Sequence, residues 1–387
     1  MDPSLFIASR LRIKGKIAIT CIAVSFLVMI IAVSVSSGYR HELRSSLSKI
    51  SGDVLLSAPD LNIMSDSRPI DLTDPAFPYV GLSETVAETV PVVWRAGVVK
   101  QGDGMHGVVV KGIPTTANDT IPLGVSIPRK LATASGLVPG DKMLTYFIGD
   151  DMKVRQFNVV DIHDALVETD DKYVVYASLS DMQRLNGWSA DQVSAVEVHL
   201  QENIDDEEKI NAATQEIGSI VRLYCENDDI VATSSVSRYP QLFNWLSLID
   251  FNVGVILLLM TIVAGFNMIS GLLIMLFENI STIGLLKSLG MTDGAISKVF
   301  LISSARLTGM GMLIGNVLAI VFCMVQSTTH LLRLNPENYF VSFVPVKVDL
   351  FTILAADAVS FAVIMVLLLI PCLFISRVDP AQTVRVK

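Results

Sequence analysis

The sequence predicts an α-helical membrane protein with four transmembrane helices and an α+β domain inserted between the first and the second. Only 17% of its 387 residues are charged, whereas soluble domains average about 25%. The apolar residues gather in four runs, each longer than the roughly 20 residues that cross a hydrocarbon core. Between the first two runs, the segment 39–245 instead mixes short strand and helix patterns, which is typical of an α+β domain.

The four apolar runs are predicted to be helices. Residues 17–37 and 251–277 contain no charged residue, the run at 299–326 contains one Arg, and the run at 350–374 contains one Asp. None of the runs alternates apolar and polar residues as a membrane strand does, and only helices and closed barrels span lipid. The sequence therefore favours four membrane-spanning helices.

A cleaved signal peptide is the alternative interpretation of the first run. Basic residues precede this run, and the small residues Ser34 and Ser36 lie near its end. Its apolar core of about 20 residues is longer than the 7 to 15 that signal peptides use. We therefore expect the first run to remain in the protein as a span.

The distribution of charge predicts the topology. Residues 39–245 hold 17 Lys and Arg against 30 Asp and Glu, whereas the rest of the chain holds 12 against 8. Basic residues cluster before the first span and after the fourth, so the positive-inside rule places both termini in the cytoplasm. In chain order, the predicted segments are a cytoplasmic interfacial helix (1–16), the first span (17–38), the outer α+β domain with two stalk helices (39–245), the second span (246–277), a cytoplasmic helix (278–294), the third span (295–327), an outer loop (328–349), the fourth span (350–375) and a cytoplasmic tail (376–387).

The outer domain is predicted to combine short strands with a few helices. Turn residues such as Gly102-Asp103-Gly104 separate its β-rich segments. The break after Ile121-Pro122 suggests a boundary between two subdomains. The expected strands lie at 90–99, 107–112, 143–148 and 156–162, and the expected helices at 129–135, 180–185 and 205–221.

The segment 278–294, between the second and third spans, is predicted to form a short helix. Leu285, Leu286 and Leu289 share one helical face, and Gly290 can adopt the left-handed conformation that ends a helix. Thr292 or Asp293 can cap the next helix. Such an exposed amphipathic helix suits the docking of a partner protein, although an ordinary connecting loop fits the same pattern.

The sequence has no recognisable catalytic or metal-binding motif. It lacks the P-loop pattern GxxxxGK[ST] and the patterns GxSxG and HExxH. Its five histidines are dispersed, and its four cysteines form no CxxC pair. We therefore expect no enzyme activity, no cofactor, no metal and no nucleic-acid partner.

Two charged residues and three glycines stand out within the predicted spans. Arg306 and Asp357 lie at opposite ends of the membrane, so we expect Arg306 to reach lipid headgroups and Asp357 to reach interfacial water. Small residues allow helices to approach closely, within one subunit or between two. The glycines expected to serve helix packing are Gly309, Gly311 and Gly315.

The segment 278–300, ENISTIGLLKSLGMTDGAISKVF, resembles the segment after the second span in ABC transporter permeases of the lipoprotein-releasing (LolC/LolE) and MacB-FtsX type. Thr282 stands where a glutamate is frequent in that family. There this segment is the coupling helix, which docks on a separate cytoplasmic ATPase. The residues for which the resemblance implies ATPase coupling are Glu278, Ile283, Gly284, Leu285, Leu286, Lys287, Leu289 and Gly290.

Further matches cover nearly the whole chain. SRVDPAQTVR at 376–385 is similar to the end of these permeases, and NPENYFVSFVPVKVDL at 335–350 resembles the lipoprotein-releasing branch. In the outer domain, VVVKGI, LATASGLVPGDKM and VYASLSDMQRLNGW also look like that branch. One departure is that only Gly149-Asp150-Asp151-Met152 separates two predicted strands, where the carrier-recruiting subunit has a long hook.

The resemblance implies a permease subunit in the bacterial inner membrane that transmits ATPase motion to a periplasmic, MacB-like domain and so releases lipoproteins. The implied partners are a cytoplasmic ABC ATPase, a second permease in a homodimer or heterodimer, membrane lipid, lipoprotein cargo and a periplasmic carrier, whose docking the missing hook leaves open. The alternatives are MacB-like efflux and FtsX-like mechanotransmission to a periplasmic partner. A membrane-anchored sensor without an ATPase is a further alternative from a different class.

Overall fold

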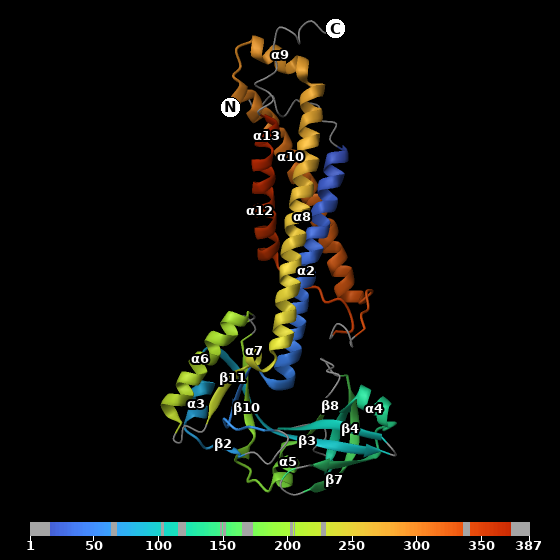
Figure 1. Ribbon diagram of the computed structural model, residues 1–387, viewed down its shortest axis with the longest axis vertical. Coiled ribbons are helices and arrows are strands. Elements are labelled where there is room, and N and C mark those ends of the chain that lie inside the picture. The colour runs from blue at the N-terminus through green and yellow to red at the C-terminus, as the bar shows by residue number, and fades with distance from the viewer. Residues whose placement is uncertain are drawn as a thin grey trace. The chain divides into compact units, whose positions relative to one another are not determined.

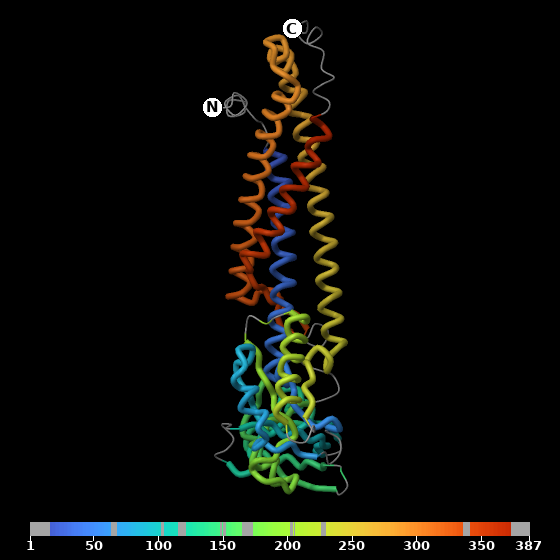
Figure 2. The backbone as a smooth tube through the Cα atoms, turned by 90° about the vertical axis from the view of Figure 1, so that its left-hand side faces the viewer, coloured from blue at the N-terminus to red at the C-terminus, as the bar shows by residue number. Residues whose placement is uncertain are grey.

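The computed structural model describes residues 16–62, 68–101, 104–114, 121–147, 149, 152–164, 173–201, 204, 206–225, 230–335 and 341–372. The chain forms two compact units, one of long helices and one built on a β-sheet (Figures 1 and 2). The helical unit comprises residues up to Arg40, Leu246–Arg333 and the residues from Phe343 onward. The sheet unit comprises His41–Trp245 and Leu334–Ser342. The predicted interfacial helix, apart from its last residue, and the predicted tail lie outside the described residues.

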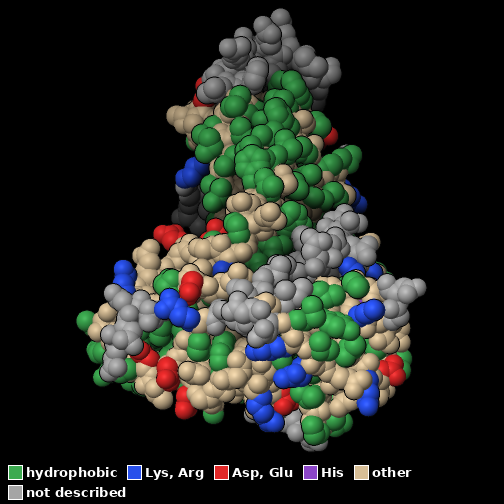
Figure 3. Space-filling view, turned by 60° about the horizontal axis from the view of Figure 1, so that its bottom comes forward, with side chains coloured by type: hydrophobic (Ala, Val, Ile, Leu, Met, Phe, Trp, Pro, Cys, Tyr) green, Lys and Arg blue, Asp and Glu red, His purple; other side chains and the backbone are tan. Residues whose placement is uncertain are grey.

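Four helices among the described residues are long and apolar enough to cross a membrane. They are α2 (Lys16–Ser51), α8 (Pro240–Glu278), α10 (Asp293–Thr329) and the fourth span, which α12 (Leu350–Leu367) and α13 (Leu369–Cys372) form together. Hydrophobic side chains cover the helical unit in the space-filling view (Figure 3). Leu258, Leu313 and Leu354 are each more than 60% exposed, which is unfavourable in water but suits contact with lipid. The predicted fold class is confirmed.

The helices pack around one apolar core. Each of the four spans contributes buried side chains to it, so the helical unit is a bundle and not a set of separate anchors. The core includes Ile22, Phe26 and Met29 from α2, Met268 and Leu272 from α8, Phe300 and Leu307 from α10, and Ile364 from α12.

Two of the helices are longer than the predicted spans. α2 continues to Ser51, past the predicted boundary at residue 38, and α8 begins at Pro240, before the predicted start at residue 246. At a rise of 1.5 Å per residue, α2 is about 54 Å long and α8 about 59 Å, against a hydrocarbon core of about 30 Å. Both helices therefore have the extra length that the predicted stalks require.

The sheet unit contains a nine-stranded sheet organised around one long strand, β3 (Val86–Gln101). The first half of β3 pairs with β10, and the second half pairs with β4 and β6. The strand order is β11-β1-β10-β3-β4-β8-β5-β7-β6, and β6 returns to β3. The other strands of this sheet are β1 (Val54–Ser57), β4 (Gly104–Ile113), β5 (Gly124–Pro128), β6 (Lys142–Phe147), β7 (Lys153–His163), β8 (Tyr173–Ser178), β10 (Ala195–Leu200) and β11 (Val231–Ser234).

Because β6 pairs with β3, the six strands from β3 to β6 close on themselves, while β11, β1 and β10 extend the sheet on the other side of β3. A small separate sheet pairs β2 (Ile70–Asp71) with β9 (Gln192–Val193). α6 packs on β11 and on α3. The helices of this unit are α3 (Ala76–Gly81), α4 (Arg129–Ser135), α5 (Leu179–Asn186), α6 (Glu207–Tyr224) and α7 (Ser235–Arg238).

The predicted subdomain boundary after Ile121-Pro122 is wrong. β5 begins at Gly124 and pairs with both β7 and β8 inside the closed set of strands. The two parts of the sheet meet instead along β3, which belongs to both. A continuous strand has no break in its composition, so a division that runs along it leaves no signal in the sequence.

The expected strands and helices of the outer domain are otherwise present, as β3, β4, β6, β7, α4, α5 and α6. The tight hairpin is confirmed as well. β6 pairs antiparallel with β7 up to Phe147, which lies opposite Lys153, so only residues 148–152 connect the two strands. The chain therefore has no room for a long hook at this position.

Candidate functional site

The predicted docking helix is α9 (Ile280–Ser288), which follows α8 after the single residue Asn279. Its end has the hydrogen bonds of a Schellman motif. The backbone N–H of Gly290 donates to the carbonyl of Lys287, and that of Met291 donates to the carbonyl of Leu286, each at 3.0 Å. Gly290 has a φ of +88°, which glycine adopts without strain. This turn ends α9 sharply.

The next helix begins two residues later. Thr292 is the N-cap of α10, and its hydroxyl accepts a hydrogen bond from the backbone N–H of Ala295 at 3.4 Å. The carboxylate of Asp293 forms an ion pair with Nζ of Lys287 at 2.9 Å, and the Lys287 side chain is only 11% exposed. Lys287 therefore bonds within its own chain and ties α9 to the first turn of α10.

α9 has an inner and an outer face. Ile283 is 1% exposed, and Leu286 packs partly buried against the core of the helical unit. Leu285 and Leu289 are 57% and 76% exposed. Leu286 therefore faces inward, unlike the two leucines with which the helical pattern grouped it, because it lies about 100° around the helix from Leu285.

The other two predicted coupling residues are Gly284, within α9, and Glu278, just before it. Gly284 is buried next to Ile283. Glu278, the last residue of α8, is exposed and lines a groove of about 440 Å³ together with Ile17 and Cys21 of α2 and Leu307 of α10. Most of the side chains that line this groove are apolar, and Glu278 is the charged residue among them.

The glycines of α10 differ in their surroundings. A Cβ added at Gly315 would lie 2.5 Å from the carbonyl oxygen of Ala23, and one at Gly311 would lie 2.7 Å from a methyl group of Ile22. Both neighbours belong to α2. A Cβ at Gly309 would have no atom within 4 Å. Gly311 and Gly315 thus let α10 approach α2 within the subunit, whereas Gly309 faces open space in the described structure.

Asp357 lies in a different environment from the expected one. Its side chain is 2% exposed, and Nδ2 of Asn316 on α10 donates to its Oδ2 at 2.5 Å. The expectation that Asp357 reaches interfacial water is therefore wrong. Arg306, in contrast, is exposed. Asn316, a polar residue in the preceding span, was the signal in the sequence for a buried partner of Asp357. The sequence does not show, however, which residues of two helices face each other.

The Asn316–Asp357 bond gives a test by double substitution. Asn316→Leu is expected to destabilise the protein by about 1–3 kcal/mol, because it leaves a buried carboxyl group without its donor. The double variant N316L/D357L removes both polar groups and is expected to recover most of this loss. Thermal unfolding of the purified protein in detergent measures both effects. A wild-type melting temperature for N316L, or a double variant less stable than N316L, would contradict this account of the contact.

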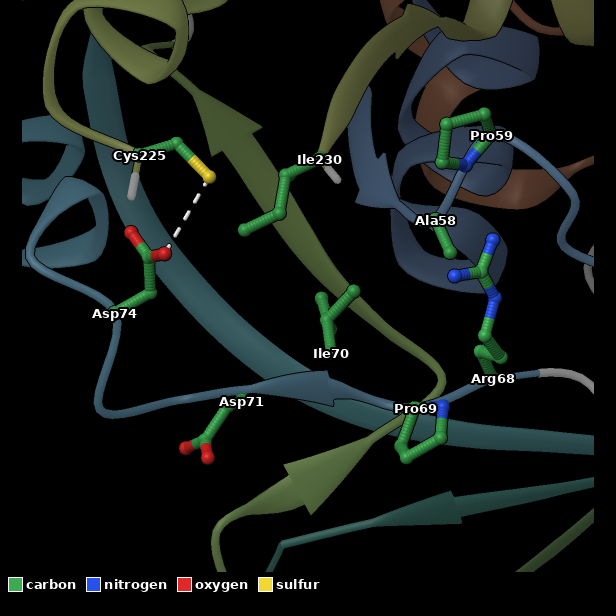
Figure 4. Close-up of a pocket in the computed structure, with 9 residues that line it drawn as sticks. All are labelled: Ala58, Pro59, Arg68, Pro69, Ile70, Asp71, Asp74, Cys225 and Ile230. Atoms are coloured by element: carbon green, nitrogen blue, oxygen red, sulfur yellow. Dashed lines mark hydrogen bonds between the residues drawn. The ribbon is translucent and has the colours of Figure 1, made fainter. Parts of the chain in front are cut away.

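The sheet unit has a small pocket of about 150 Å³ (Figure 4). Sγ of Cys225 donates to Oδ2 of Asp74 at 3.3 Å, and the side chains of Ile70 and Ile230 lie between this pair and Arg68. Among the described residues, no group of three or more His, Cys, Asp or Glu side chains could hold a metal ion. The residues that line the pocket thus supply two carboxylates, one guanidinium group and one thiol.

Known proteins resemble this chain in both of its parts. Residues 254–380 match the family described as FtsX-like permease C-terminal. The chain is 20% identical to the lipoprotein-releasing system transmembrane protein LolC of Xylella fastidiosa, over 94% of this chain and 92% of that protein. It is 22% identical to LolE of Haemophilus influenzae, over 95% of this chain and 93% of that protein.

Among solved structures, the periplasmic region of MacB from Actinobacillus actinomycetemcomitans aligns with 51% of this chain and 96% of its own length, at 12% identity and a TM-score of 0.30. The family match includes most of α8, all of α9 and α10 and the fourth span. The chain is therefore a multi-pass membrane protein whose residues 254–380 match the FtsX-like permease C-terminal family, and it is similar over most of its length to the LolC and LolE transmembrane proteins.

Proposed function

We propose that this chain is the transmembrane permease subunit of an ABC transporter that releases lipoproteins from the bacterial inner membrane. The observation that carries the proposal is α9, a short helix between two spans that turns the apolar side chains of Leu285 and Leu289 outward. An amphipathic helix whose inner face is anchored and whose outer face is apolar suits a groove on a partner protein. The proposed partner is an ABC ATPase, because the chain itself has no P-loop.

The proposed topology places α9 in the cytoplasm, together with both termini. The basic residues before the first span and after the fourth favour this orientation. The acidic sheet unit then lies in the periplasm. An ATPase bound to α9 and a lipoprotein bound outside would thus act on opposite sides of the membrane, and the permease would connect them.

The proposed mechanism is mechanical. ATP-driven closure of two ATPases would move the α9 helices of two permeases, and rigid helices would carry that movement outward. α2 and α8 are suited to this because each runs without interruption from the helical unit into the sheet unit. They are also bonded to each other, since Asp250 of α8 accepts from Ser36 at 2.6 Å and pairs with Arg40 of α2. The two helices would therefore move together.

The cargo and the second permease belong to this proposal. The names of the relatives refer to lipoprotein release, which supports lipoproteins as cargo. The second permease would be another copy of this chain or a related chain. A carrier protein, if one collects the cargo, would dock elsewhere than on a hook, because the β6–β7 connection is short.

The short β6–β7 connection also favours a second candidate function, one that needs no carrier protein. MacB-like efflux or FtsX-like control of a periplasmic partner would use the same α9 and the same long helices without a carrier. These functions differ from lipoprotein release only in what the outer domain contacts, so the partners of the intact protein distinguish them.

Purification of the tagged, intact chain from crosslinked membranes, followed by mass spectrometry, tests the proposal. We expect to recover an ABC ATPase together with lipoproteins. Recovery of an ATPase with an outer-membrane duct or a cell-wall hydrolase would replace lipoprotein release by the second function. Recovery of no ATPase would refute both and favour a sensor.

A further inference from the structure

The last turn of α2 accepts a hydrogen bond from a buried ammonium group, which belongs to a lysine of the sheet. Lys111 lies on β4, and its side chain is 2% exposed. Its Nζ donates to the carbonyl oxygen of Ile50 at 2.6 Å and to Oε2 of Glu197 on β10 at 2.8 Å. It also lies 5.0 Å from the ring centroid of Trp94 on β3. A single side chain thus ties the end of α2 to three neighbouring strands.

A second cation holds the residues that follow. Arg238 is the last residue of α7, and its Nη2 donates to the carbonyl oxygens of Ser51 at 2.8 Å and Gly52 at 2.9 Å. The last carbonyl groups of a helix have no partner within the helix and carry partial negative charge. Arg238 therefore stabilises the end of α2 directly before α8 begins at Pro240.

The chain then turns sharply into the sheet. Gly52 has a φ of +64°, and a Cβ at this position would lie 2.9 Å from Cβ of Glu197. The carboxylate of Asp53, which is 1% exposed, accepts from the backbone N–H of Leu200 and the hydroxyl of Ser48, each at 2.9 Å. Asp53 thus bonds the turn between α2 and β1 to α2, through Ser48, and to β10, through Leu200.

Stability alone does not account for the pair of Lys111 and Glu197. Burial lowers the pKa of Lys111 and raises the pKa of Glu197, so loss of water disfavours the charged form of each. Apolar residues of similar volume are often as stabilising as a buried ion pair. An apolar pair, however, cannot bond the carbonyl of Ile50. What the ion pair adds is a fixed position for the end of α2.

We propose that Lys111 and Glu197 are positioning residues that couple α2 to the centre of the sheet. Without them, the bonds of Asp53 and Arg238 would still hold the turn at Gly52, but the last turn of α2 would lose its bond to β4. With them, movement of α2 reaches β4 directly, in addition to β10, to which the Asp53 carboxylate already links Ser48 of α2. We call the contact of the last turn of α2 with Lys111 and Glu197 the joint. The proposal rests on the proposed function for the source of the movement, but the rigidity of the joint is a property of the chain itself.

The variant K111M/E197M tests the joint in the full chain. It replaces both charges by apolar side chains, because removing one charge alone would leave the other buried and uncompensated. The matched control is R129M/D164M, which removes an ion pair on the same sheet whose side chains are 64% and 76% exposed. We expect both variants to fold and to melt near the wild-type temperature.

Spin labels measure the rigidity of the joint without any partner. Cysteines replace Lys49 of α2 and Met105 of β4, which are both exposed, in a chain without its four native cysteines. We expect one narrow distance distribution in the wild-type background and in the control, and a broad distribution in K111M/E197M. A narrow, unchanged distribution in K111M/E197M would overturn the proposed joint, whatever the function of the protein.

Reconstitution with the recovered ATPase measures transmission. Proteoliposomes contain a tagged triacylated lipoprotein as the probe, and release is counted per ATP hydrolysed. We expect K111M/E197M to hydrolyse ATP at nearly the wild-type rate but to release about tenfold less lipoprotein per ATP, a coupling loss of the size that such contacts produce. Wild-type release per ATP by this folded variant would overturn the role in transmission. Absence of any ATPase from the wild-type preparation would refute the proposed function. The spin-label distances alone would then test the rigidity of the joint.

Discussion

Replacing both Leu285 and Leu289 with Asp is expected to abolish recovery of the ABC ATPase with this chain. The two side chains are 57% and 76% exposed at the outer face of α9. Burial of one leucine contributes about 1.5–3 kcal/mol, so loss of two should weaken association by at least about 100-fold. The ATPase that remains with the purified protein, determined by mass spectrometry and by ATP hydrolysis, measures the loss.

The fold should survive this change, because the inner face of α9 is untouched. Ile283 still anchors the helix, and the Schellman motif at Gly290 depends on backbone groups. The matched control is L82D/L223D, since these two leucines are 78% and 73% exposed in the sheet unit. The control should retain the ATPase. Equal recovery with both double variants would mean that α9 is not the docking site.

Gly315→Ala adds a single methyl group to α10, and we expect it to lower the stability of the protein more than the same change at the other glycines of this helix. Its Cβ would lie 2.5 Å from the carbonyl oxygen of Ala23 and 2.9 Å from Cβ of Phe26. Backbone atoms and Cβ atoms cannot rotate away, so the two helices must separate. Such overpacking costs about 1–3 kcal/mol. The melting temperature of the detergent-solubilised protein should therefore fall, and the loss should be larger for Gly315→Leu.

Gly309→Ala is the matched control in the same helix. A Cβ at Gly309 meets no atom within 4 Å, and Ala favours a helix over Gly by about 1 kcal/mol. The same chemical change should thus lower stability at Gly315 and leave it equal or higher at Gly309. If Gly315→Ala melted at or above the wild-type temperature, α10 and α2 would not be in contact at that point.

Local features of the chain were predictable from the sequence. The end of α9 at Gly290, the cap at Thr292 and the tight β6–β7 hairpin depend on neighbouring residues, so the pattern of a few positions suffices. The leucines of α9 show where this reasoning stops. Periodicity grouped Leu286 with Leu285 and Leu289, but only the position of the surrounding helices decides which part of an apolar face is buried.

Contacts between distant residues were not predictable. Asp357 bonds to Asn316, 41 positions away, and Glu197 bonds to Lys111, 86 positions away. The sequence shows each of these as a lone polar residue in an apolar run, and many partners are possible for each. The closed set of six strands depends in the same way on the return of β6 to β3.

The four spans, the inserted α+β domain and the short helix between the second and third spans could be predicted from the sequence. The spans follow from the length of the apolar runs, which the thickness of the bilayer and the rise of the helix convert directly into structure. The sequence did not show which glycines face another helix, that Asp357 is buried against Asn316, or that the last turn of α2 bonds to Lys111. These are decided by the packing of elements far apart in the chain, where close contact and the loss of water select one partner for each buried group.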